Sequence, residues 1–105
     1  MKFMDLYPGL IRLHILHHAA REPVYGVGLM EELARHDYKM SPGTLYPILH
    51  ALEQEGYLRS AEEPGGSHPR RVYRATPAGR RALDDGRRRV KQLFGELFEE
   101  ERRGR

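Results

Sequence analysis

Residues 41–58, SPGTLYPILHALEQEGYL, constrain the fold of this chain more than any other stretch. Ser41 suits a helix N-cap, with Pro42 at the first helical position. Pro47 removes an amide donor and crowds the carbonyl of Gly43. We predict one helix over 41–55 with a distorted first turn, ending before Gly56, and the alternative is a turn over 41–46 with the helix starting at Pro47. Its apolar residues recur at intervals of three and four and predict one buried face: Leu45, Ile48, Leu49 and Leu52.

The other face of this predicted helix is unusual for a plain solvated surface. A helix anchored in a core that presents hydroxyls, a phenol and an imidazole near its N-terminus is typical of a nucleic-acid reader. The alternative for Tyr46 is that it caps the edge of the core, and the alternative for His50 is a solvated side chain. The candidate DNA-contacting residues in and just before this helix are Lys39, Ser41, Pro42, Gly43, Thr44, Tyr46, Pro47 and His50.

The length and composition of the chain limit the classes of protein to which it can belong. A chain of 105 residues has room for one core. It has no cysteine, which excludes disulfides and thiolate chemistry. Charged residues interrupt its N-terminus, and no apolar run approaches the ~20 residues of a membrane span. We therefore expect a cytoplasmic protein with no membrane partner.

The charge distribution and the catalytic motifs bear on two classes of function, nucleic-acid binding and catalysis. The net charge of +3 arises entirely within residues 76–105, because nine basic and nine acidic residues balance in residues 1–75. Overall charge is therefore weak evidence for a nucleic-acid partner. The sequence shows no nucleophile–base arrangement, phosphate-binding glycine loop or paired catalytic acids. We expect no enzymatic activity and no cofactor.

The flanking segments predict further elements. Residues 6–20 form a first helix that is apolar on two sides, and residues 25–36 form a second, with Val27, Met30, Leu33 and Ala34 on its apolar face. Residues 57–63 and 70–75 predict two strands joined by a turn at 64–69. Thr76 and Pro77 repeat the cap-plus-proline signal before a long helix over 77–101. The tail at 99–105 is expected to fray.

The last helix is too long to bury its apolar residues on so small a domain, so it calls for a partner helix, most simply from a second copy. Phe94 and Phe98, with Tyr7, offer an alternative as the lining of a pocket for a small-molecule effector between subunits. The predicted dimerisation residues are Leu6, Leu10, Leu83, Val90, Leu93, Phe94, Leu97 and Phe98.

Three helices, a two-stranded hairpin and a long helix define a mainly α fold with a small β-hairpin. This order is that of a winged helix-turn-helix with a long C-terminal dimerisation helix. We assign residues 1–75 to the winged helix-turn-helix domain, and residues 76–105 to the dimerisation helix with its frayed tail.

The hairpin and the second helix add candidate DNA contacts. Arg70 and Arg71 follow a Gly-Gly turn, which favours contact with the DNA backbone in or near the minor groove, with a solvated strand edge as the alternative. We expect Arg74 to form an ion pair within the protein. Tyr25, at a helix start, suits a phosphate contact or plain packing, and His68 lies at the predicted wing tip.

Three histidines share one helix. His14, His17 and His18 lie three and four residues apart, a spacing that brings imidazoles together on one side, as a divalent metal site requires. Packing at an interface and a pH-sensitive contact are the alternatives. We expect no metal, and these three residues are only candidates for one.

The motifs Tyr25-Gly26, SPGTLYPIL at 41–49, LEQEGYL at 52–58 and PRRVYRATPAG at 69–79 resemble the PadR family of bacterial transcriptional regulators. The resemblance covers about residues 9–83, and the C-terminal part resembles the short subtype. It implies an effector-responsive repressor that binds a pseudo-palindromic operator in double-stranded DNA as a homodimer.

Two positions depart from the family pattern. Ser67-His68 stands where the family often has Gly-Arg, and Gly28 stands where it often has a longer polar residue. A winged-helix module that binds another protein, and a metal-responsive repressor that uses the histidine cluster, remain the competing functions.

Overall fold

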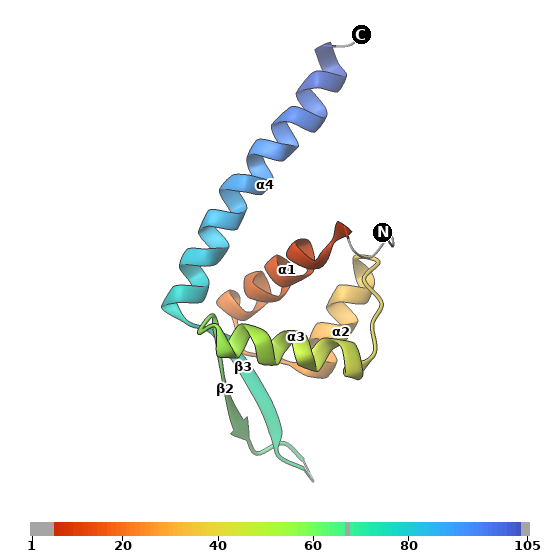
Figure 1. The fold of residues 1–105 in the computed structure, drawn as a ribbon. Helices are drawn as coiled ribbons and strands as arrows, with labels where there is room; N and C mark the ends of the chain where they lie inside the picture. Colours follow the sequence, from red (N-terminus) through yellow and green to blue (C-terminus); the bar gives the residue numbers. More distant parts are fainter. Residues whose placement is uncertain (1–5, 67, 104–105) are drawn as a thin grey trace.

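The computed structural model describes residues 6–66 and 68–103. Three helices pack into a small body, a hairpin projects from it, and the last helix extends away as a long rod (Figure 1). The elements follow in the order α1 (Pro8–Arg21), β1 (Val24–Tyr25), α2 (Gly26–Arg35), α3 (Pro42–Gln54), β2 (Leu58–Glu63), β3 (Arg70–Ala75) and α4 (Pro77–Arg103). This arrangement confirms the predicted helix, hairpin and long-helix architecture of a winged helix-turn-helix.

The sheet has three strands rather than the predicted two. Its order is β1-β3-β2, and both neighbouring pairs are antiparallel. In β1, Val24 lies opposite Tyr73 and Tyr25 lies opposite Val72. Two residues are too few to show the alternation by which a strand is found in a sequence, so β1 was not predicted. Its pairing ties the start of α2 directly to the hairpin.

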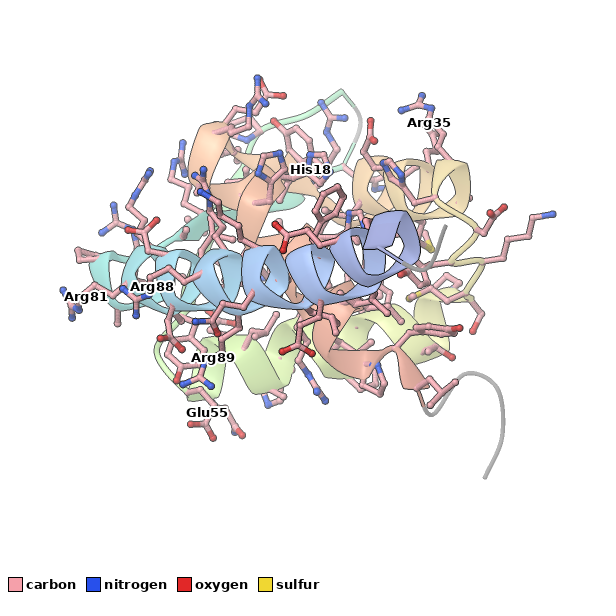
Figure 2. All side chains as sticks on the ribbon, turned by 90° about the horizontal axis from the view of Figure 1, so that it is seen from above. His18, Arg35, Glu55, Arg81, Arg88 and Arg89 are labelled. Atoms are coloured by element: carbon pink, nitrogen blue, oxygen red, sulfur yellow. The ribbon has the colours of Figure 1, made fainter. Side chains whose placement is uncertain are left out.

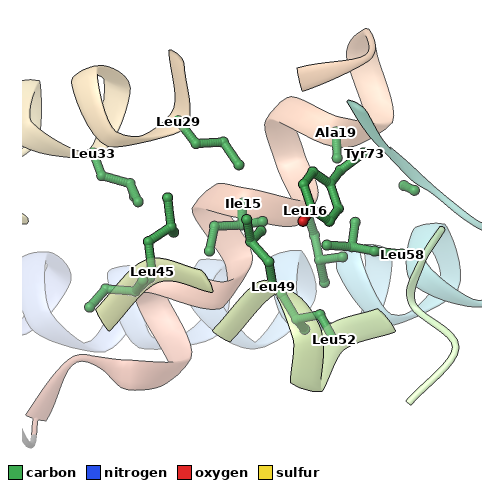
Figure 3. Packing of buried hydrophobic residues seen from close by; sticks show 12 residues of the cluster. Ile15, Leu16, Ala19, Leu29, Leu33, Leu45, Leu49, Leu52, Leu58 and Tyr73 are labelled. Carbon is green, nitrogen blue, oxygen red and sulfur yellow. The ribbon is translucent and has the colours of Figure 1, made fainter. Parts of the chain in front are cut away.

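The core confirms the apolar face predicted for α3. Leu45 and Leu49 are fully buried and Leu52 is nearly so, while Ile48 is partly buried. They meet buried side chains from α1, α2 and the sheet (Figure 3). Burying one such leucine contributes roughly 1.5–3 kcal/mol. This contact fixes which face of α3 points outward.

The buried face of α2 differs in part from the one predicted, and in α1 packing selects one of the two apolar sides. In α1 the core side chains are Ile11, Ile15, Leu16 and Ala19, while Leu10 is exposed. In α2, Leu29 is buried although it was not predicted, whereas Val27 is 61% exposed. Apolar residues occupy more than one side of each helix, so spacing alone did not show which side faces the core.

Helix α3 begins at Pro42 as predicted, with Pro47 inside it. Ser41 is the N-cap residue, but its side chain makes no capping hydrogen bond. Its carbonyl accepts from the amides of both Thr44 and Leu45, each at 3.0 Å. The first turn therefore combines the tighter and the regular helical hydrogen bond, and it leaves the Ser41 hydroxyl 3.4 Å from that of Thr44.

Helix α4 starts at the predicted cap and is anchored there by several hydrogen bonds. The Thr76 hydroxyl accepts from the Gly79 amide at 3.0 Å and donates to the Gly56 carbonyl at 2.5 Å. The helix continues to Arg103, which extends it into the segment where fraying is predicted. Across the described ranges 6–66 and 68–103, none of the helices has the length and apolarity needed to cross a membrane.

Candidate nucleic-acid interface

The outward face of α3 presents the residues predicted to contact DNA. Leucines on the opposite face hold the helix on the core, so its N-terminal half forms a fixed surface. Lys39 is exposed just before the helix. The exposed residues of the helix start and first turns are Ser41, Pro42, Gly43, Thr44, Tyr46, Pro47 and His50. No lysine or arginine lies within α3, so cations must come from neighbouring segments.

Tyr46 combines packing with exposure. Its hydroxyl lies against Gly26, so close that a Cβ atom there would overlap it, and yet the side chain is 41% exposed. Gly26 thereby lets the phenol rest on the first turn of α2. This explains a glycine at a helix start, where its helix propensity is poor. Tyr46 thus locks α2 to α3 while keeping one edge available to a partner.

A shallow pocket beside the start of α3 adds a cation that sequence reasoning missed. It has a volume of about 480 Å³, and Arg12 from α1 lines it together with Lys39, Ser41 and Thr44. Two cations and two hydroxyls next to a helix N-terminus favour an anion such as a DNA phosphate. Arg12 lies about thirty residues from α3 in the sequence, and only the packing of α1 on α3 brings it here.

The wing arginines are engaged within the protein. The Arg70 guanidinium lies over the ring of Tyr25, 4.4 Å from its centroid. Arg71 donates to the Ser60 hydroxyl at 2.9 Å and pairs with Glu62 at 3.5 Å. Arg74 pairs with Glu63 at 3.3 Å, which confirms the ion pair predicted for it.

Tyr25 and His68 occupy different parts of the predicted interface. Tyr25 is half-buried in β1, and its hydroxyl donates to Glu63 at 3.4 Å. His68 is exposed near the hairpin tip, close to Gly66, whose φ of 61° lies in the left-handed region that favours glycine. Ser67, one of the two departures from the family pattern, lies outside the described residues.

One of the three predicted histidines, His14, meets a fourth, His36, which is the C-cap residue of α2. The His14 ring lies 4.7 Å from that of His36 and 6.5 Å from that of His18, with the Tyr38 ring at 5.4 Å. Glu32 lies about 4 Å from both His18 and His36, at 4.0 and 3.9 Å. Within the described part of the chain, no group of three or more His, Cys, Asp or Glu residues is placed to hold a metal ion.

This cluster predicts that acid destabilises the fold. Burial lowers the pKa of His14 below 6.5, and the adjacent His36, His18 and His17 lower it further, against an opposing effect of Glu32. Burial also lowers the pKa of His17, helped by His18 and the nearby Arg21 and Arg87. The unfolded chain then binds more protons than the native one, so stability falls as pH drops through 6.5 toward the lower native pKa.

We therefore expect His14→Gln to flatten the decline of the melting temperature between pH 7.5 and pH 5.5. Thermal unfolding followed by circular dichroism measures this slope. His50→Gln, which removes an exposed imidazole outside the cluster, is the matched control. Equal slopes for wild type and His14→Gln would show that the cluster does not govern the acid response.

The apolar side chains of α4 lie open on its outer half. Five of them, each 42–60% exposed, form a surface that we call the α4 stripe: Val90, Leu93, Phe94, Leu97 and Phe98. At its other end α4 is held against α1, where Gly86 faces the Leu13 side chain.

Helices α1 and α4 then diverge (Figure 1). Their side chains line a groove of about 990 Å³. Leu10, Leu83, Val90 and Phe94 contribute its apolar lining. Phe94 is the member of the predicted effector pocket that lines it. Tyr7 and Phe98 are not among its lining residues. Tyr7 packs beside Tyr38, and Phe98 contacts Phe94 along α4.

A fixed helix with an exposed N-terminal half, followed by a projecting hairpin, defines a winged helix-turn-helix. The chain belongs to the PadR-like family of transcriptional regulators, whose model matches residues 15–85. Members of this family are DNA-binding regulators and not enzymes.

Individual relatives agree with this assignment. The chain is 55% identical to the transcriptional regulator Rv3488 of Mycobacterium tuberculosis, across 84% of this chain and 82% of that one. It is 31% identical to the transcriptional regulator YqjI of Escherichia coli, of which it spans 41%. The crystal structure of a PadR family regulator from Eggerthella lenta DSM 2243 has a TM-score of 0.78 and 35% identity, with coverage of 90% of this chain and 83% of that chain.

Proposed function

We propose that this regulator is a homodimeric repressor that binds a pseudo-palindromic operator in double-stranded DNA. The carrying observation is the exposed N-terminal half of α3, held rigid by a fully buried leucine face. Such a helix enters the major groove with its first residues toward the base edges. Thr44 and His50 are proposed to contact bases or phosphate there, and Tyr46 and Pro47 to provide apolar contact with a thymine methyl or sugar.

The α4 stripe supports the homodimer. Five large apolar side chains open to water on one helix are unusual for a monomer and are typical of an interface. A second copy pairing through α4 and the groove beside Leu10 covers this surface. Two-fold symmetry then sets two α3 helices toward successive major grooves on one side of the duplex. Leu6, 60% exposed just before α1, is proposed to join this interface.

We propose that such a dimer represses by occupying promoter DNA and blocking transcription there. A small molecule that enters the α1–α4 groove would alter the distance between the two α3 recognition helices of the dimer. The dimer would then release the operator. A DNA partner supports a cytoplasmic location for the protein.

The direct test selects bound DNA from a random pool with the purified protein. We expect a palindromic consensus, and a binding constant that falls steeply with salt because phosphate contacts release counterions. Lys39→Gln should lower the slope of log binding constant against log salt by about one. Thr44→Val should weaken binding while leaving that slope at its wild-type value. Absence of any enriched sequence, together with a protein partner retained at high salt, would favour the protein-binding module instead.

A further inference from the structure

The two arginines at the start of β3 point to opposite faces of the wing, because neighbouring residues of a strand alternate. Arg70 lies opposite Glu63 in β2, and Arg71 lies opposite Glu62. Each arginine therefore has a separate set of neighbours. One set belongs to the α2 side of the molecule and the other to α3.

On the first face, Arg70 joins the wing to the start of α2. Its guanidinium carbon lies 4.4 Å from the centroid of the Tyr25 ring, within the range of a cation–π contact. Tyr25 is the residue from which α2 begins, and its hydroxyl donates to Glu63 on β2. Arg70 also fills the space beside Gly65, where an added Cβ would lie 2.5 Å from its Nε atom.

On the second face, Arg71 joins the wing to α3 through a chain of hydrogen bonds. It donates to the Ser60 hydroxyl at 2.9 Å. Ser60 in turn donates from both its hydroxyl and its amide to one oxygen of Glu53, at 2.6 and 3.1 Å. Glu53 belongs to the last turn of α3, so this relay connects β3, β2 and the proposed reading helix.

A hairpin that projects from a small body needs such links, since two strands alone are only marginally stable in water. The nearest buried residue of β3 to the tip is Val72, and none of the described residues beyond it, 62–66 and 68–71, is buried in the core. We propose that Arg70 and Arg71 are positioning residues that hold the wing at a fixed angle to α2 and α3, and that they do not contact phosphate. This inference rests on the proposed DNA-binding function.

The test compares operator affinity and its salt dependence by fluorescence anisotropy. Arg70→Gln and Tyr25→Leu are each expected to weaken binding about two- to fivefold, with the double variant no weaker than either one. Neither changes the salt slope, because no phosphate contact is lost. Tyr25→Phe keeps the ring and should restore most of the affinity. Arg59→Gln removes an exposed arginine of β2 and sets the level for nonspecific loss of charge.

The second link is tested by a change that removes no charge. Ser60→Ala interrupts the relay between Arg71 and Glu53, so it should weaken binding to the same degree as Arg71→Gln, again without changing the salt slope. A fall in slope of about one in Arg70→Gln or Arg71→Gln, with wild-type affinity in Tyr25→Leu and Ser60→Ala, would overturn the positioning role alone. A wild-type protein that shows no salt-dependent DNA binding would instead overturn the proposed function.

Discussion

Leu97→Glu is expected to convert the proposed dimer to a monomer and to weaken operator binding by about 100-fold or more. Leu97 lies in the centre of the α4 stripe and is 57% exposed in the single chain. A carboxylate there would have to be buried without a partner when two copies pair, at a cost that exceeds the gain from the remaining apolar contacts. The dimer is therefore lost.

The large loss of operator affinity arises because one molecule no longer binds both half-sites. In a dimer, occupation of one half-site holds the second reading helix near the other half-site at a high effective concentration. A monomer binds each half-site separately and forfeits this advantage. Because Leu97 packs on no buried core residue of its own chain, the monomer should keep its helical circular dichroism.

Light scattering at micromolar concentration and anisotropy with the selected operator measure the two effects. Gln92→Glu is the matched control, since it adds the same charge on the side of α4 away from the stripe, at about 100° of rotation per residue. It should remain dimeric and bind DNA like wild type. If Leu97→Glu stayed dimeric with unchanged affinity, the interface would have to lie outside the α4 stripe.

The sequence predicted the helices and the hairpin because their signals are local. The spacing of Leu45, Leu49 and Leu52, the Thr76-Pro77 cap and the Gly-Gly turn each depend on residues close together in the chain. Strand β1 was missed since two residues carry no periodicity. The buried face of α1 was ambiguous because Leu10 and Ile11 are both apolar, and tertiary packing selects between them.

For the candidate site, the sequence predicted which residues take part but not the contacts that they make within the protein. Lys39, Thr44 and His50 are exposed beside or on the proposed reading face, as their place in the α3 motif indicated. The links of Arg70 to Tyr25 and of Arg71 to Glu53 depend on strand register and on β1, which the sequence does not reveal. Arg12 reaches the start of α3 through helix packing, again a tertiary effect.

Gly79→Ala is expected to destabilise the fold by about 2–3 kcal/mol, although local rules predict the opposite sign. Alanine is the better helix former by roughly 1 kcal/mol, so a glycine in the first turn of α4 looks replaceable. A Cβ at this position, however, would overlap the backbone carbonyl oxygen of Tyr57. Backbone atoms, unlike the end of a flexible side chain, have little freedom to move aside.

The neighbouring hydrogen bonds make that overlap costly. The Tyr57 carbonyl accepts from the Thr76 amide at 3.1 Å, and the Tyr57 amide donates to the Leu52 carbonyl at 2.9 Å. The Gly79 amide itself donates to the Thr76 hydroxyl. Moving Tyr57 therefore strains the end of α3, and moving Gly79 breaks the cap of α4. Either response weakens the packing of the proposed dimerisation helix against the winged domain.

Urea unfolding of wild type and variant measures the change in free energy, and Gly28→Ala supplies the control. Gly28 is also helical, but an added Cβ there meets nothing within 4 Å. Its replacement should stabilise the protein by roughly 0.5–1 kcal/mol through helix propensity alone. Opposite signs at the two glycines would show that close backbone approach, and not helix propensity, explains Gly79. A stabilising effect at both would mean that α4 does not rest on Tyr57 in solution.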